Sequence, residues 1–229
     1  MRSFDERLRD IGDAGCVSDV SGRGTVLLAF GGLGQSMGVP PFEFFNLTVG
    51  YDVDRIFVRD TQRGFYHRGV TDVGRTIVEI RDHVAGLIPD GSRVITIGVS
   101  AGGYAALLFG TLLGVDEVHA ISPITCLTRG GRLVLRDRRW PAEMRAIRRE
   151  PLLQPEYLDL RAVAAAHGLP PTSIYVARDN RVDRRHTGRL ADRPEVTVHL
   201  QPGDSHLVVK QMRADGTLEA LVARSLAPG

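Results

Sequence analysis

The sequence predicts an α/β protein, a mainly parallel sheet flanked by helices, in a single domain that spans residues 1–229. Two observations lead to this prediction. Short apolar runs rich in β-branched residues recur along the chain, and most are continuous, as expected of strands covered on both faces. Stretches with helical periodicity lie between these runs, and such alternation favours crossover connections and a parallel sheet.

Each element can be placed by its residue range. The predicted strands are the apolar runs at 25–30, 55–59, 93–99, 117–122, 173–177 and 195–200. The predicted helices lie at 72–88, 101–114, 184–192 and 218–227. The second of these helices is apolar nearly all round, so we expect it to pack centrally on the sheet. Gly114 is a suitable C-terminal stop for it.

Residues 123–171 interrupt this alternation and form a predicted helical insertion within the domain. In a parallel sheet such an insertion would lie over the carboxyl ends of the strands, where ligands bind. Its segment 129–149 holds eight arginines and only two acidic residues. Arginine forks bind carboxylate and phosphate groups in two-point contacts, so Arg138 and Arg139 are candidates for binding an anionic or carrier-bound substrate. The alternative is that these arginines are solvated faces of amphipathic helices.

Composition excludes several classes of protein. The net charge of +2 does not suggest a nucleic-acid partner. Two cysteines, Cys16 and Cys126, are too few for a disulfide framework and lack metal-ligand spacing. No apolar run is long enough for a membrane span, and residues 1–12 lack the apolar core of a signal peptide. We therefore expect a cytoplasmic protein, and the excess of arginine over the single Lys210 suggests a GC-rich bacterial genome.

A serine stands where a predicted strand gives way to a predicted helix. Gly98, Ser100 and Gly102 form the pattern G-x-S-x-G, which is weak evidence as letters alone. Between a strand that ends near Val99 and a helix that begins near Ala101, however, the pattern predicts a nucleophile elbow, a strained turn that exposes the serine hydroxyl. The Ala101 N–H would then lie at a helix N-terminus, aimed at a developing oxyanion. The alternative is a helix N-cap serine.

A serine nucleophile needs a base and an acid that orients the base. Of the seven histidines, His206 lies in a loop between the last predicted strand and the last predicted helix, where it would overhang the carboxyl end of the sheet. Two aspartates follow the next-to-last predicted strand, at 173–177. Asp179, just past the strand end, is the preferred acid, and Asp183, which could instead cap the next helix, is the alternative.

The order Ser–Asp–His, the elbow "GVSAGG", the acid segment "DNRVDRRHTGRLA" and the histidine loop "GDSH" together resemble the α/β-hydrolase fold over roughly residues 23–227. The resemblance implies that Ser100 is the nucleophile, Asp179 the acid and His206 the base. The usual oxyanion loop of this family begins His-Gly, whereas this chain has "FGGLGQ". The N-terminal half is also similar to hydrolase-like proteins linked with bacterial surface polysaccharides.

The glycine-rich loop at 30–36 can supply a second oxyanion donor, the N–H of Gly32 or Leu33. Arg59 and Tyr66, after the next strand, are candidates for lining the substrate pocket.

Together these residues predict a serine hydrolase that cleaves an ester or thioester through an acyl-enzyme, with no metal and no cofactor. An acyltransferase with the same triad is one alternative, and a non-catalytic binding protein of the same fold is another. The oligomeric state is left open.

Overall fold

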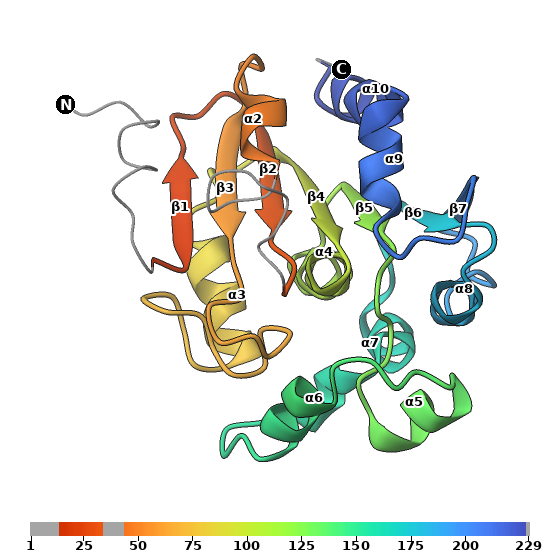
Figure 1. The fold of residues 1–229 in the computed structure, drawn as a ribbon. Helices are drawn as coiled ribbons and strands as arrows, with labels where there is room; N and C mark the ends of the chain where they lie inside the picture. Colours follow the sequence, from red (N-terminus) through yellow and green to blue (C-terminus); the bar gives the residue numbers. More distant parts are fainter. Residues whose placement is uncertain (1–13, 34–43, 228–229) are drawn as a thin grey trace.

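A twisted sheet of seven strands forms the centre of the protein in a computed structural model, which describes residues 14–33 and 44–227 (Figure 1). The strand order is β1-β3-β2-β4-β5-β6-β7, and every neighbouring pair is parallel except β1 with β3. The strands are β1 (Cys16–Asp19), β2 (Thr25–Phe30), β3 (Asp54–Val58), β4 (Arg93–Val99), β5 (Glu117–Ile121), β6 (Thr172–Ala177) and β7 (Val196–Gln201). The predicted α/β class and mainly parallel sheet are confirmed.

The central strands are buried because their residues are apolar on both faces. Strand β2 is buried from Val26 to Phe30 and β4 from Val94 to Val99, and both begin and end where the sequence predicts. The one strand that the sequence analysis missed is β1. It has four residues, of which only Val17 is buried, so it shows neither a continuous apolar run nor a long alternation.

Helices cover both faces of the sheet. The described helices are α2 (Phe45–Thr48), α3 (Ile77–Ala85), α4 (Ala101–Leu113), α5 (Arg129–Val134), α6 (Pro141–Arg148), α7 (Leu160–His167), α8 (Arg181–Gly188), α9 (Val208–Ala214) and α10 (Thr217–Ser225), with a 3₁₀ turn at Pro155–Leu158. Apolar side chains of α3, α4 and α7 pack on one face, and those of α2, α9 and α10 pack on the other (Figure 1). Helix α4 is buried from Ala101 to Thr111, as expected of a central helix.

The chain between β5 and β6 is helical, and it reaches back to the other loops at the carboxyl ends of the strands. Helices α5 and α6 lie beyond α7, away from the sheet (Figure 1). Arg63, in the segment after β3, pairs with Glu143 of α6 at 3.1 Å. The Phe65 ring packs edge-on against Trp140, with centroids 5.9 Å apart. These contacts bring α6 and the residue before it against the segment that follows the carboxyl end of β3.

Candidate active site

Ser100 occupies the turn between β4 and α4. Its backbone angles, φ 56° and ψ −111°, lie in a region that non-glycine residues rarely adopt, so the turn is strained. Two hydrogen bonds fix the strained residue: its N–H donates to Ile121 O at 2.9 Å, and its carbonyl accepts from the Tyr104 N–H at 2.9 Å. The geometry is that of a strand–turn–helix elbow with a serine at its tip.

The glycines around Ser100 are required by close backbone approach. A Cβ on Gly98 would lie 2.1 Å from the carbonyl oxygen of Gly102. A Cβ on Gly102 would lie 2.2 Å from the carbonyl oxygen of Phe30, at the end of β2. Glycine at both positions therefore lets the start of α4 press against the ends of two strands.

His206 lies between Ser100 and an aspartate. Its Nε2 is 2.8 Å from Ser100 Oγ, and its Nδ1 is 2.7 Å from Oδ2 of Asp183. A carboxylate can only accept, so Nδ1 carries the proton and Nε2 is left with the lone pair that accepts from the serine hydroxyl. The imidazole therefore has the tautomer and the direction that a general base for Ser100 needs.

The acid in contact with His206 is Asp183, the alternative, and not the preferred Asp179. Asn180 caps α8 by accepting from the Asp183 N–H at 3.0 Å, so Asp183 lies in the first turn with its carboxylate fully buried. Asp179 is exposed in the tight turn between β6 and α8, where its N–H donates to Gly203 O at 3.0 Å. Asp179 lies in the turn, too early in the chain to face His206. Asp183, in the first turn of the helix, is placed to face it.

An arginine from the segment between α5 and α6 holds the same carboxylate. Arg139 Nη1 donates to Asp183 Oδ1 at 2.8 Å, and its Nε donates to Asp137 Oδ1 at 2.9 Å. Nη1 also lies 3.1 Å from His206 Nδ1. Since both of these nitrogens carry protons, they do not bond to each other but donate to one carboxylate. Arg139, expected to bind substrate, thus contacts the acid beside His206.

Trp140 and two buried aspartates complete this cluster. The Arg139 guanidinium lies 4.7 Å from the centroid of the Trp140 ring, which is itself 5.6 Å from the His206 ring. Burial alone would lower the pKa of Arg139, but its hydrogen bond with Asp137 and the charge of Asp183 outweigh burial and raise it. The guanidinium is therefore a permanent cation at this position.

His186 of α8 anchors Asp137 from the other side. The Thr125 N–H donates to His186 Nδ1 at 3.0 Å, so the ring proton is on Nε2, which donates to Asp137 Oδ2 at 2.9 Å. Burial lowers the pKa of His186, which keeps the ring neutral. Burial would raise the pKa of Asp137, but the hydrogen bonds from His186 and Arg139 hold it well below its ordinary value. No sequence motif marks these contacts, because they join residues far apart in the chain.

Comparison with known proteins identifies the fold. No protein-family model and no curated protein matches the chain. Among solved structures, the capsule O-acetyltransferase of Neisseria meningitidis serogroup A is similar at 14% identity, with a TM-score of 0.62, over 90% of this chain and 91% of that one. The fluorophosphonate-binding serine hydrolase F of Staphylococcus aureus is similar at 17% identity, with a TM-score of 0.58, over 92% and 86%. The chain has the α/β-hydrolase fold.

An esterase of Pyrobaculum calidifontis is also similar, at 13% identity and a TM-score of 0.60, over 91% of this chain and 78% of the esterase. The structural neighbours with the α/β-hydrolase fold thus include esterases, other hydrolases and an O-acetyltransferase.

In the α/β-hydrolase fold, the oxyanion donors are the N–H after the nucleophile and an N–H from a loop that follows a central strand. Ala101 begins α4 directly after Ser100 and is fully buried. In the loop after β2, the Gly31 N–H donates to Val58 O at 2.8 Å, so it is engaged in structure. Gly32 and Leu33 follow it and are buried, while residues 34–36 of the expected loop lie outside the described ranges.

Tyr66 and Arg59 support this loop and the neighbouring strand. The buried Tyr66 hydroxyl donates to Gly31 O at 2.8 Å, which fixes the start of the glycine-rich loop. Arg59 is 6% exposed, and its Nε donates to Ala14 O at 2.7 Å. Both side chains were expected to line the substrate pocket; both are buried, and each donates a hydrogen bond to a backbone carbonyl.

Within residues 14–33 and 44–227, no group of three or more histidine, cysteine or acidic side chains could hold a metal ion. None of the helices in these ranges combines the length and apolar character needed to cross a membrane.

Proposed function

We propose that this protein is a serine hydrolase that cleaves an ester or thioester through an acyl-enzyme on Ser100. The observation that supports the proposal is the pair of contacts at His206, 2.8 Å to Ser100 Oγ and 2.7 Å to Asp183. In this proposal Asp183 is the acid of the triad, and Asp179 is not part of it.

In the proposed reaction His206 carries a proton twice, once in each half. His206 Nε2 takes the proton of Ser100 Oγ as the oxygen bonds to the substrate carbonyl carbon, and returns it to the departing alcohol or thiol. Water then attacks the acyl-enzyme, giving its proton to Nε2, and Ser100 leaves with that proton as the acid is released. The N–H of Ala101 and that of Gly32 or Leu33 would hold the negative oxygen in both steps.

Transfer of the acyl group to an alcohol is the second candidate function. It is supported by the similarity to the capsule O-acetyltransferase, which has the highest TM-score among the three structures described above and is matched over 91% of its length. Only the second step differs, because an alcohol oxygen replaces water as the attacking group. At 14% identity the similarity supports a proposal about which molecule accepts the acyl group. The proposed roles of Ser100, His206 and Asp183 are the same in both candidate functions.

Labelling with a fluorophosphonate probe tests whether Ser100 is a nucleophile. We expect one label per chain, located at Ser100 and lost in Ser100→Ala. Absence of labelling in folded protein would favour a binding protein with the same fold. The acceptor is tested with p-nitrophenyl acetate in the presence of added alcohols: free acetate indicates hydrolysis, and an acetyl ester of the alcohol indicates transfer.

A further inference from the structure

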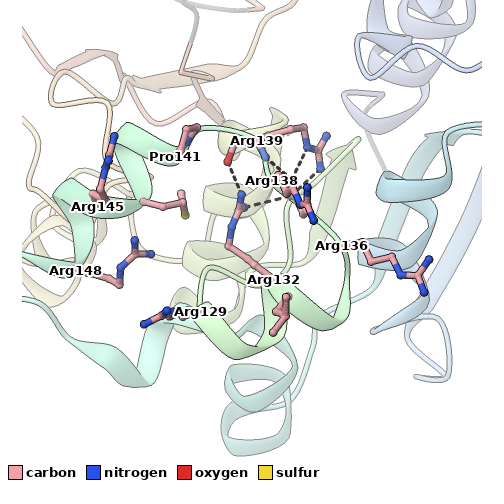
Figure 2. A pocket seen from close by; sticks show the side chains of 11 residues that line it. Arg129, Arg132, Arg136, Arg138, Arg139, Pro141, Arg145 and Arg148 are labelled. Carbon is pink, nitrogen blue, oxygen red and sulfur yellow. Dashed lines mark hydrogen bonds and ion pairs between the residues drawn. The ribbon is translucent and has the colours of Figure 1, made fainter.

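A cavity rich in arginine lies between α5 and α6, beside the candidate triad. Its volume is about 940 Å³, and seven of the residues that line it are arginines (Figure 2). They come from one short segment, because α5, the turn after it and α6 fold around the cavity. Ser100 and His206 are not among the lining residues, so the serine lies outside this cavity.

The arginines fall into two groups by their partners. Arg132 and Arg139 are bonded to Asp137, the one acidic residue in the lining. That carboxylate also accepts a hydrogen bond from His186, so both of its oxygens already have donors. The other lining arginines are exposed, and the structure records no acidic partner for them among the described residues; they are Arg129, Arg136, Arg138, Arg145 and Arg148.

Figure 2 shows Arg129, Arg145 and Arg148 extended along one side of the cavity, whereas dashed lines mark the bonds of Arg132 and Arg139. These two arginines share Asp137 as a partner. Like charges gathered around a concave surface repel one another unless an anion lies among them. The whole chain has a net charge of only +2, so this positive charge is local and does not reflect a generally basic surface.

The shape and the donor type favour phosphate. Several guanidinium forks around one cavity offer many N–H donors at short range, and a phosphate group presents several anionic oxygens within the same small volume. A carboxylate would satisfy one fork and leave the others without a partner. A flat anionic surface such as a membrane could not enter a cavity.

The position of Arg139 connects this cavity with the triad. Arg139 lines the cavity, and its Nη1 also donates to Asp183 at 2.8 Å, beside the imidazole that contacts Ser100. We propose that the arginine-lined cavity binds the phosphate groups of the substrate while the acyl group reaches Ser100. This inference rests on the proposed function, because it assigns the phosphate to a molecule that reacts at Ser100. Phosphate binding itself can be measured without turnover.

Binding of inorganic pyrophosphate to the Ser100→Ala protein, measured by calorimetry at fixed ionic strength, tests the cavity alone. Removing one charged fork should weaken binding about tenfold, so we expect that loss in Arg145→Gln and in Arg138→Gln. Arg149→Gln is the matched control, because Arg149 is exposed in the same segment but does not line the cavity. Equal affinity in the Arg145 and Arg149 variants, or no binding at all, would overturn the proposal.

Two kinetic arms on the otherwise unaltered enzyme then distinguish the source of the phosphate. If the acyl donor carries it, kcat/KM for acetyl-coenzyme A should exceed that for acetyl-pantetheine, and Arg145→Gln should remove the difference. If the acceptor carries it, glycerol 3-phosphate should be acylated from p-nitrophenyl acetate faster than glycerol, again with loss in Arg145→Gln.

The outcomes separate this inference from the proposed function. Pyrophosphate binding without a preference in either arm, in an enzyme that is labelled at Ser100, would overturn the assignment of the cavity to the substrate. Failure of fluorophosphonate labelling would instead count against the proposed function, whatever the pyrophosphate affinity.

Discussion

Asp183 and Asp179 lie four residues apart, yet only Asp183 faces His206. Asp183→Asn keeps the size of the side chain but removes its charge and lets it present a donor to Nδ1, so the imidazole would lose its required tautomer. By analogy with the same change in other triads, we expect kcat to fall about 10⁴-fold. Asp179→Asn should leave kcat unchanged, because its carboxylate is exposed.

The measurement is kcat for a p-nitrophenyl ester in both variants, with unfolding curves to show that each is folded. A larger loss in Asp179→Asn than in Asp183→Asn would contradict the structure. The sequence could not rank the two aspartates, because the choice depends on where the strand ends and which face of the first helical turn meets the histidine loop. Asn180, which takes the capping role, leaves Asp183 available for His206.

His67 links stability to pH. It is 2% exposed, and burial lowers its pKa to about 3, well below the value of about 6.5 in an unfolded chain. Below pH 6.5 the unfolded chain therefore binds a proton that the folded protein does not bind. The contribution of His67 to the free energy of unfolding is complete above that pH and is lost as the pH falls towards 3. The expected slope is about 1.4 kcal/mol per pH unit for this one group.

His67→Gln isolates that contribution. The Tyr104 hydroxyl donates to Tyr157 O and so accepts from His67 Nε2, at 2.7 Å, and a glutamine amide can supply the same donor without titrating. Urea unfolding at several pH values between 6 and 4.5 gives the free energy of unfolding as a function of pH. Its slope should be smaller in the variant by about 1.4 kcal/mol per pH unit, the contribution of one group. Burial also lowers the pKa of His186, so some slope should remain. An unchanged slope would show that His67 is protonated in the folded protein.

At the scale of the element, the turn at Ser100 depends on glycines that have no Cβ. Gly98→Ala would place a Cβ 2.1 Å from the backbone oxygen of Gly102, which is part of a buried helix and cannot move aside cheaply. Overpacking of this kind should lower the free energy of unfolding by about 3 kcal/mol. We expect a large drop in the urea midpoint, or failure to fold as its extreme.

Gly130→Ala is the matched control. Gly130 lies inside α5, and a Cβ added there would have no neighbouring atom within 4 Å, so alanine should be neutral or should stabilise the helix by up to about 1 kcal/mol. Comparable losses in both variants would mean that the glycines around Ser100 are not required by close packing.

The strands were predictable because each central strand is a continuous β-branched apolar run with both faces buried. Strands β2 and β4 therefore match their predicted bounds. Helix α3 is shorter than predicted, since Thr76 caps it and the preceding residues form a turn closed by the Val70–Gly74 bridge. Helix α9 was missed, because its seven residues are too few to show a clear period beside the histidine loop.

At the scale of the whole molecule, the sequence predicts the layers but not the contacts across them. Ser100 and His206 are 106 positions apart, and Arg139 and Asp183 are 44 apart. The histidine loop could be inferred from the order of the strands. The tie between Arg139 and Asp183 could not, because it depends on how α5 and α6 fold over the end of the sheet, and nothing local in the sequence specifies that.

The same tie leads to a prediction about cooperativity. Trp140, the single tryptophan, lies between α5 and α6 and reports on that segment, while far-ultraviolet circular dichroism reports mainly on the rest of the fold. If residues 123–171 are part of one domain, opening them would leave the buried carboxylate of Asp183 without Arg139 and would part Asp137 from His186, at a large cost. Tryptophan fluorescence and circular dichroism should therefore give coincident urea transitions.

Arg139→Met should separate the two signals, because it removes the tie but keeps an apolar side chain against Trp140. In that variant we expect the fluorescence transition to move to lower urea than the transition in circular dichroism. The single-domain prediction would be contradicted if the unaltered protein lost its tryptophan signal first. In that case residues 123–171 would unfold as a unit of their own, and the arginine-lined cavity could open without disturbing the sheet that holds Ser100.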